Sequence, residues 1–269
     1  MSSNAKPARQ SGYSSRPDYD VHFEPCPKRV RVMFGGTTVA DSTRVQRLHE
    51  TKHLPVYYFP RQDVRMELLT PTAHETFCPY KGEASYWSVA AGGKSAENAV
   101  WSYEAPFAEV AEIKDYLAFY WNRMDAWYEE DEEVFVHPRD PYVRVDILES
   151  RREVEVVLGG RSVASSRRGR FLFETGLPTR YYLPAEDVDM ALLIESGKVT
   201  ACPYKGTAHY WSARIDGQVF EDIVWSYPQP TPESGKIKDH LCFFNELVDE
   251  IRVDGVAQAR PKTKWSRDK

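Results

Sequence analysis

Hydrophobic residues at alternate positions predict short β-strands along most of the chain. Residues 30–34 place two valines and a phenylalanine on one face, and Gly35-Gly36 then predicts a hairpin turn, because glycine accepts the positive φ of tight turns. Residues 154–158 and Gly159-Gly160 repeat this arrangement. Turn signals recur about every eight to twelve residues and no long segment has helical periodicity, which is typical of antiparallel β-proteins. The sequence therefore predicts a mainly β fold.

One segment of the chain occurs twice. Cys78–Ser88 reads CPYKGEASYWS and Cys202–Ser212 reads CPYKGTAHYWS, so nine of eleven positions are identical at an offset of 202 − 78 = 124. The same offset relates the two predicted hairpins and holds from Val30 to Phe119. We therefore expect two β-rich domains that superpose at this offset, as an internal pseudo-dimer. The oligomeric state of the whole chain stays open.

The repeat sets the expected domain boundaries. They are a flexible arm over residues 1–27, a first unit over 28–130, an acidic segment and linker over 131–150, a second unit over 151–256 and a tail over 257–269. The linker contains Pro138 and Pro141, so we expect it to be stiff. The tail is basic and almost without apolar residues, which predicts disorder.

Bulk composition argues against several classes of protein. The net charge is −5, so no overall positive field attracts nucleic acid. No apolar run reaches the length of about eighteen residues that a membrane-spanning helix needs, and the polar N-terminal segment does not resemble a secretory signal. Of the four cysteines, only Cys78 and Cys202 are equivalent in the repeat. A disulfide framework is therefore not expected, and a cytoplasmic location is the simplest interpretation.

Metal sites and shared catalytic dyads are not expected either. Each unit offers one retained cysteine, and no histidine is retained in both copies, whereas structural zinc needs four ligands. A cysteine–histidine or serine–histidine dyad common to both copies is excluded for the same reason. Cys78 precedes a proline, and we interpret it as a small buried group rather than a nucleophile. No cofactor is predicted.

Polar and aromatic residues retained in both copies form the candidate ligand site. A turn at Lys81-Gly82 presents an ammonium group and backbone donors together, which suits an anionic oxygen. An exposed loop lysine is an equally good interpretation, and Trp101 and Tyr103 could belong to the core. The candidate ligand-binding residues are Arg44, Glu50, Tyr58, Lys81, Tyr86, Trp101 and Tyr103 in the first unit, and Arg168, Glu174, Tyr182, Lys205, Tyr210, Trp225 and Tyr227 in the second.

The retained charges predict a cleft. Charges of both signs beside aromatic residues are costly to bury without partners, so a cleft explains them better than a core. Arg44 and Glu50 either pair with each other or act as the acid and the anion anchor of the site. If the cleft binds an anion, alanine at Lys81 and Lys205 should abolish binding and leave the melting temperature within a few degrees. We expect five residues to line the cleft in each unit: Glu50, Tyr58, Lys81, Trp101, Tyr103 and their equivalents.

The retained motifs resemble the bacterial domain-of-unknown-function family 427, from about Val30 to Val253. The resemblance implies a β-tent-like fold in each unit, in which two antiparallel sheets meet at an angle with a pocket between them. Some collections give this family a nucleotidyltransferase-like label, and β-tent relatives often hold zinc through cysteine pairs, which this chain lacks. The motifs that carry the resemblance are Glu50-Thr51, Tyr57-Tyr58-x-Pro60, Asp63-Val64, Cys78-Pro79-Tyr80-Lys81-Gly82-x-Ala84-x-Tyr86-Trp87 and Trp101-Ser102-Tyr103.

Three function classes follow from these observations. The first is a binding module that holds a small anionic or planar ligand in each unit, anchored by the retained lysine and Arg44 or Arg168. The second is a nucleotidyltransferase-like enzyme, in which the lysine stabilises phosphate charge and Glu50 or Asp115, with their equivalents, holds Mg²⁺ or acts as a base. The third is a structural or interaction protein without a pocket. Partners other than a small molecule are not predicted.

Overall fold

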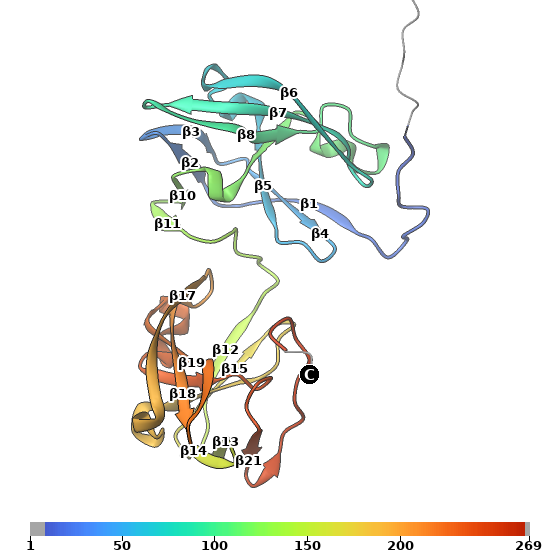
Figure 1. The fold of residues 1–269 in the computed structure, drawn as a ribbon. Helices are drawn as coiled ribbons and strands as arrows, with labels where there is room; N and C mark the ends of the chain where they lie inside the picture. The colour runs from blue at the N-terminus through green and yellow to red at the C-terminus, as the bar shows by residue number, and fades with distance from the viewer. Residues whose placement is uncertain (1–8, 267–269) are drawn as a thin grey trace, which may run out of the picture. The chain divides into compact units, whose positions relative to one another are not determined.

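The computed structural model describes residues 9–266, and these residues form mainly β-strands. The chain divides into two compact units between Asp140 and Pro141. Each unit contains one large and one small antiparallel sheet (Figure 1). The predicted mainly β fold with two tandem domains is therefore confirmed. The predictions for residues 1–8 of the arm and 267–269 of the tail lie outside the described residues.

The first unit pairs a seven-stranded sheet with a four-stranded one. The order in the large sheet is β1 (Val21–Pro25), β4 (Gln46–Glu50), β5 (Val56–Pro60), β9 (Tyr116–Phe119), β8 (Lys94–Ser102), β7 (Gly82–Ala91) and β6 (Leu69–Cys78). The order in the small sheet is β11 (Glu132–Val134), β10 (Ala126–Glu129), β2 (Val30–Phe34) and β3 (Thr37–Ser42). Four 3₁₀ helices connect strands: η1 (Arg61–Asp63), η2 (Met66–Leu68), η3 (Ala108–Ile113) and η4 (Trp121–Arg123).

The second unit repeats this topology strand for strand. Its large sheet runs β12 (Val145–Glu149), β15 (Arg170–Glu174), β16 (Arg180–Pro184), β20 (His240–Phe243), β19 (Gln218–Pro230), β18 (Gly206–Ile215) and β17 (Leu193–Cys202). Its small sheet runs β22 (Val256–Ala257), β21 (Glu250–Val253), β13 (Val154–Leu158) and β14 (Arg161–Ser166). Its 3₁₀ helices are η5 (Ala185–Asp187), η6 (Met190–Leu192) and η7 (Pro232–Ile237).

The first strand of each large sheet lies before the unit boundary that the repeat predicted. β1 lies within the expected arm and pairs residue for residue with β4, from Val21 opposite Glu50 to Pro25 opposite Gln46. β12 lies within the expected linker and pairs in the same way with β15. β11, at the acidic segment, adds an edge strand to the small sheet of the first unit. These strands are short and partly exposed, so the alternation that marks a strand is weak in them.

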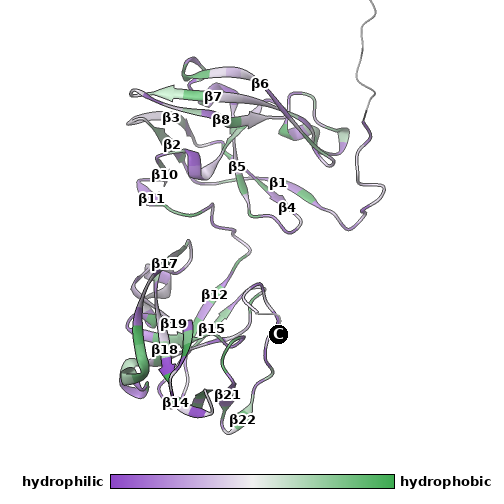
Figure 2. Ribbon diagram, viewed as in Figure 1, coloured by the Kyte–Doolittle hydropathy of each residue, from purple (hydrophilic) through white to green (hydrophobic). Residues whose placement is uncertain are grey.

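Alternating side chains of the large sheet enter two different apolar clusters in the first unit. Tyr57 and Trp87 join the cluster shared with the small sheet, whereas their neighbours Tyr58 and Tyr86 join the cluster on the opposite face. Residues of η3 cover this second cluster. Figure 2 shows hydrophobic segments on the strands of both units, interrupted by hydrophilic ones. The period of two residues along each strand therefore places aromatic side chains on both faces of the sheet.

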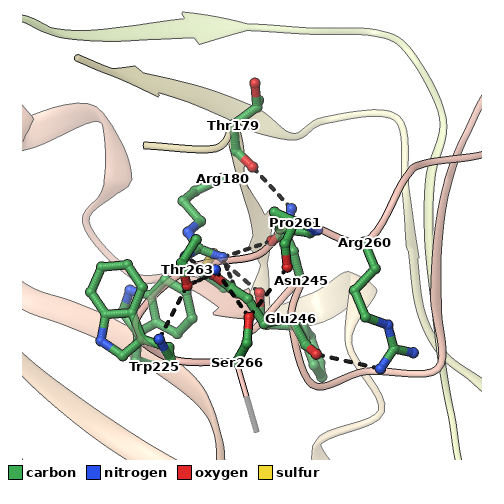
Figure 3. A network of polar contacts seen from close by, with 12 residues as sticks. Thr179, Arg180, Trp225, Asn245, Glu246, Arg260, Pro261, Thr263 and Ser266 are labelled. Atoms are coloured by element: carbon green, nitrogen blue, oxygen red, sulfur yellow. Dashed lines mark hydrogen bonds and ion pairs between the residues drawn. The ribbon is translucent and has the colours of Figure 1, made fainter. Parts of the chain in front are cut away.

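The C-terminal tail is ordered as far as Ser266, contrary to the predicted disorder. Thr263 donates a hydrogen bond to Glu246, and Arg260 donates to backbone carbonyls at positions 246, 248 and 249. The Trp265 ring lies 5.5 Å from the guanidinium carbon of Arg180. Figure 3 shows the polar contacts of Arg260 and Thr263 near Arg180 and Glu246. The tail contains few apolar residues, but its order depends on one tryptophan and on polar contacts with distant residues.

Replacing Trp265 by alanine is expected to lower the free energy of unfolding of the second unit by about 2 kcal/mol, because a cation–π contact and aromatic burial are lost. Thermal and chemical unfolding of the full chain would measure the effect. Lys262→Ala, at an exposed position of the same tail, is the matched control and should change stability by less than about 0.5 kcal/mol. Equal stability of the two variants would contradict the packing described here.

Among the described residues, no helix has both the length and the apolar character needed to cross a membrane. The expected absence of a membrane partner and the cytoplasmic location remain predictions.

Candidate functional site

The turn between β6 and β7 is fixed against the segment that follows β8. Gly82 has φ +102°, and a Cβ atom there would lie 3.3 Å from the carbonyl oxygen of Ala105. The equivalent Gly206 has φ +98°, with the carbonyl oxygen of Gln229 only 2.8 Å from such a Cβ. Glycine is therefore retained because the backbone is left-handed and closely approached. Phe107 also donates its N–H to the carbonyl of residue 81 over 3.3 Å.

This docked turn directs Lys81 inward, where it forms an ion pair with Glu50 at the end of β4. β4 and β7 are the second and sixth strands of the large sheet, so four strand spacings, about 19 Å, would separate them in a flat sheet. The ion pair therefore requires the sheet to curl and make one face concave. Lys205 and Glu174 form the same pair in the second unit.

Both ion pairs are buried. The side chains of Lys81 and Glu50 are 7% and 11% exposed, and those of Lys205 and Glu174 are 10% and 8% exposed. Neither lysine is the exposed loop residue that the sequence allowed. The expectation that alanine at these positions leaves the melting temperature nearly unchanged is therefore withdrawn, because removing the lysine leaves a carboxylate buried without its cation.

Aromatic residues line the concave face beside each ion pair. The Trp101 indole donates a hydrogen bond to the Tyr58 hydroxyl over 3.4 Å, and the equivalent bond from Trp225 to Tyr182 is 3.0 Å. The Lys81 ammonium lies 5.8 Å from the centre of the Tyr103 ring. The structure thus brings together the five residues that we expected to share one site. Tyr58, Trp101 and Tyr103 belong to the cluster covered by η3, whereas the space between the large and small sheets is filled by apolar core.

Tyr86 joins this cluster through a partner that sequence reasoning missed. Its hydroxyl and that of Thr76 are 2.8 Å apart, and Tyr210 and Thr200 are related in the same way at the same distance. Thr76 and Thr200 are also separated by 124 residues. The identity between the copies could therefore have identified these threonines, although it could not have shown what they contact.

Arg44 pairs with Asp63 rather than with the residues around Lys81. Its guanidinium bonds to Asp63 over 2.6 Å, and Ser42 donates to the same carboxylate. Arg168 and Asp187 form the equivalent pair in the second unit. The alternative in which Arg44 pairs with Glu50 is therefore wrong, whereas the role of Arg44 and Arg168 as anion anchors stays a prediction; Arg44 lines a surface cavity with Arg61, Asp115 and Tyr116. Both arginines are more than half exposed and hold the 3₁₀ turn that follows β5 or β16.

Two other retained polar residues have backbone roles. Asp115 and Asp239 have φ values of +67° and +60°, and aspartate tolerates this left-handed conformation better than most residues. Ser88 accepts a hydrogen bond from the backbone N–H of Asn98, which also has positive φ, at an irregularity in the pairing of β7 with β8. These conformations give a structural reason for the retention of these residues in both copies.

Glu50 is held in its charged form by its contacts. Burial opposes ionisation, but the Lys81 charge and hydrogen bond, together with a hydrogen bond from Tyr19, outweigh it and lower the pKa of Glu50 below the ordinary value of 4.5. Burial raises the pKa of Tyr103 and Tyr227 well above 10, so both phenols remain protonated. The site therefore presents a carboxylate, an ammonium and a phenol side by side, and the first two charges cancel.

The depressed pKa of Glu50 predicts how the first unit responds to acid. The contribution of the ion pair to stability should be fully present above pH 4.5 and should be lost as the pH falls through the lower pKa of the folded state. The test is to measure the free energy of unfolding of the wild type and of Glu50→Gln from about pH 7 to about pH 3, a range that spans the ordinary pKa values of carboxyl groups. The two free energies should converge in acid. Glu83→Gln, at an exposed position of β7, should show no such convergence.

Tyr19 is a site residue that the sequence did not reveal. Its hydroxyl donates a hydrogen bond to Glu50, and its ring stacks on Tyr80 with the ring centres 3.5 Å apart and the planes 8° from parallel. It lies in the expected flexible arm, and position 143, its equivalent at the offset of 124, is valine. Identity between the copies therefore gave no signal for Tyr19.

Metal ligands do not converge at the site. The described residues contain no group of three or more His, Cys, Asp or Glu side chains placed to hold a metal ion. The four cysteines are free thiols, with Cys26 and Cys242 buried and Cys78 and Cys202 partly buried.

A family model supports the division into two copies. The model described as a domain of unknown function (DUF427) matches residues 22–130 and, separately, residues 146–254. Each match starts within the edge strand of a large sheet, β1 or β12, and each contains one lysine–glutamate pair. A comparison with curated proteins finds no significant match.

Proposed function

The chain belongs to the family described as a domain of unknown function (DUF427), of which it contains two tandem copies, and we propose that each copy is a binding module for a small molecule. The site is the concave face of the large sheet, at the lysine–glutamate pair. Because the two charges neutralise each other, a neutral or zwitterionic planar ligand suits the site better than a simple anion.

The observation that carries this proposal is the buried ion pair, which recurs in both units. Desolvating a lysine and a glutamate is costly, and a packed apolar pair of similar size is often as stable or more stable. Retention of the charges in both copies therefore favours a function other than stabilising the fold. Binding a ligand that forms hydrogen bonds with the carboxylate and the ammonium would be such a function.

The phenols beside the pairs support the same conclusion. Tyr103 and Tyr227 are each about 6% exposed, yet neither hydroxyl forms a hydrogen bond with any described residue. Neither hydroxyl oxygen is fully enclosed by protein atoms, so each reaches the surface of its unit. Each phenol is therefore available to a ligand as a donor or an acceptor, next to the aromatic wall of the site.

The nucleotidyltransferase-like alternative receives less support from the geometry. Magnesium chemistry on phosphates needs carboxylates free to coordinate the ion. Glu50 and Glu174 are each engaged with a lysine, and the exposed Asp115 is retained at a left-handed backbone position. A binding module is therefore the function that these residues serve best.

Native mass spectrometry of the purified protein tests the proposal. We expect a small molecule to remain bound to the wild type and to be lost from the double variant Glu50→Gln, Glu174→Gln, because the amides keep the side-chain shape but remove the charge. Glu83→Gln is the matched surface control and should retain the molecule. A wild type without any bound small molecule, or a double variant that keeps it, would contradict the proposal.

A further inference from the structure

A surface cavity of the first unit lies apart from the lysine–glutamate pair. It measures about 860 Å³ and is formed where β4 and β9 begin and β5 ends, a size within the range of about 300–1,000 Å³ that is usual for small-molecule sites. Its lining, among the described residues, includes neither Lys81 nor Glu50. It does include Arg44 and Asp115, two retained residues that the proposed function does not use. The cavity is therefore a second candidate site.

The apolar wall of this cavity is common to both units. Pro60, Val64 and Met66 line it, and the same residue types recur 124 positions later. The backbone N–H of Arg61 donates to the carbonyl of Asp115 over 3.0 Å, which joins η1 to the turn before β9. The wall is thus held in place by the fold, and a small apolar group can pack against it.

Hydrogen-bond donors dominate the polar part of the lining. The two guanidinium groups each carry five N–H donors. Arg44 donates one bond to Asp63 over 2.6 Å, and Arg61 donates one to Glu104 over 2.9 Å. Both groups therefore keep further donors in a planar fork, the geometry that matches a carboxylate or a phosphate. The side chains of Gln46, Gln62 and Tyr116 add neutral donors to the same lining.

The carboxylates of the lining oppose an anion only weakly. Glu67 accepts a hydrogen bond from Arg65 over 2.8 Å, so its charge is paired. Asp115 is exposed, and salt screens its charge from a ligand on the other side of the cavity. An anionic group bound by the guanidinium forks therefore gains more than it loses.

The second unit neutralises the corresponding arginine. Arg168 lies 2.6 Å from Asp187 and 3.8 Å from Glu186, so two carboxylates face it. Position 62 of the first unit is glutamine instead of glutamate. In the amide orientation that satisfies both groups, its oxygen accepts bonds from Arg44 over 2.9 Å and 3.1 Å. The first unit thus places an uncharged partner where the second places a negative one.

From these contacts we propose that the cavity of the first unit binds a small organic oxyanion, a carboxylate or phosphate group on a flat apolar body. Arg44 and Arg61 bind the oxyanion, and the apolar body packs against Met66 and the Tyr116 ring. The second unit, with Ala185 in place of Arg61, lacks one of the two anchors. This site goes beyond the proposed function, because both its position and the charge of its ligand differ.

Titration calorimetry of the full chain with benzoate and phenyl phosphate tests the inference and distinguishes the two oxyanions on the same ring. We expect at least one of them to bind with one molecule per chain. Benzamide has the shape of benzoate without its charge, and inorganic phosphate has the charge without the ring. Each should bind about tenfold more weakly than its parent or worse, because a charge-assisted bond or the apolar contact is lost.

The second unit supplies variants that this fold already accepts. Arg61→Ala and Gln62→Glu introduce the residues found at positions 185 and 186, and each should weaken binding about tenfold or more. Glu186→Gln is the matched control, because it changes the equivalent position of the other unit and should leave the affinity unchanged.

The outcomes are independent of the molecule expected at the lysine–glutamate pairs, whose retention is measured separately. A wild type that binds neither benzoate nor phenyl phosphate overturns the inference, as do Arg61→Ala and Gln62→Glu variants that bind as the wild type does. Benzamide equal to benzoate would refute the role of the charge. Inorganic phosphate equal to phenyl phosphate would show adventitious anion binding and refute the organic ligand.

Discussion

Replacing Arg180 by leucine is expected to destabilise the second unit by about 3–5 kcal/mol, the largest effect of any single substitution considered for this chain. The guanidinium bonds to both carboxylate oxygens of Glu246, over 2.6 Å and 2.7 Å, and the Glu246 side chain is 0% exposed. Leucine would leave that carboxylate buried without its cation. Chemical unfolding of the full chain, followed by tryptophan fluorescence, measures the loss.

Two controls separate the buried pair from ordinary charge loss. Arg168→Leu removes an arginine that is 61% exposed, from its pair with Asp187, and should cost less than about 1 kcal/mol. The double variant Arg180→Leu, Glu246→Leu removes both charges and should recover much of the stability. A double variant that is less stable than Arg180→Leu would show that Glu246 stabilises the unit through partners other than Arg180, such as Thr263.

Replacing Lys81 by alanine is expected to lower the stability of the first unit by about 3 kcal/mol. Glu50 would keep the hydrogen bond from Tyr19 but would lose the Lys81 ammonium group in a site that is almost closed to solvent. The expected result is a lower unfolding transition for the first unit alone, because the second unit keeps its own pair. Hydrogen exchange, which reports the two units separately, measures this difference.

Lys94→Ala is the matched control for this prediction. Lys94 pairs with Asp125 on the surface, and its side chain is 61% exposed, so its removal should cost less than about 1 kcal/mol. Equal losses for the two variants would show that burial of the Lys81–Glu50 pair has no energetic consequence.

The local pattern of apolar, polar and glycine residues was enough to predict the fold class and the turns. The hairpin at Gly35-Gly36 needs only two glycines after an alternating strand, and both have positive φ, of +58° and +71°. The repeat then extended each local prediction to the second unit. The turn at Lys81-Gly82 was identified in the same way, because its glycine is required by the backbone itself.

The contacts that make the site depend on long-range geometry, which local pattern does not contain. Glu50 meets Lys81 because a seven-stranded sheet curls, whereas Arg44 meets Asp63 because a 3₁₀ turn follows β5. Arg44 and Glu50 are both identical in the second copy, so identity between the copies could not show which of them pairs with Lys81. Tyr19 was missed for the opposite reason: it matters in one copy only. Comparison of the two units in three dimensions resolves both cases.

Reversal of the Lys205–Glu174 pair tests most directly whether the ion pair serves a ligand or only the fold. The double variant Lys205→Glu, Glu174→Lys keeps two opposite charges in contact but exchanges their positions, so stability should remain close to that of the wild type. Native mass spectra of this variant should show one bound small molecule fewer than the wild type, because only the pair of the second unit is reversed. A reversed variant that folds normally and retains as many molecules as the wild type would show that the pair does not recognise a ligand, and would contradict the proposed function.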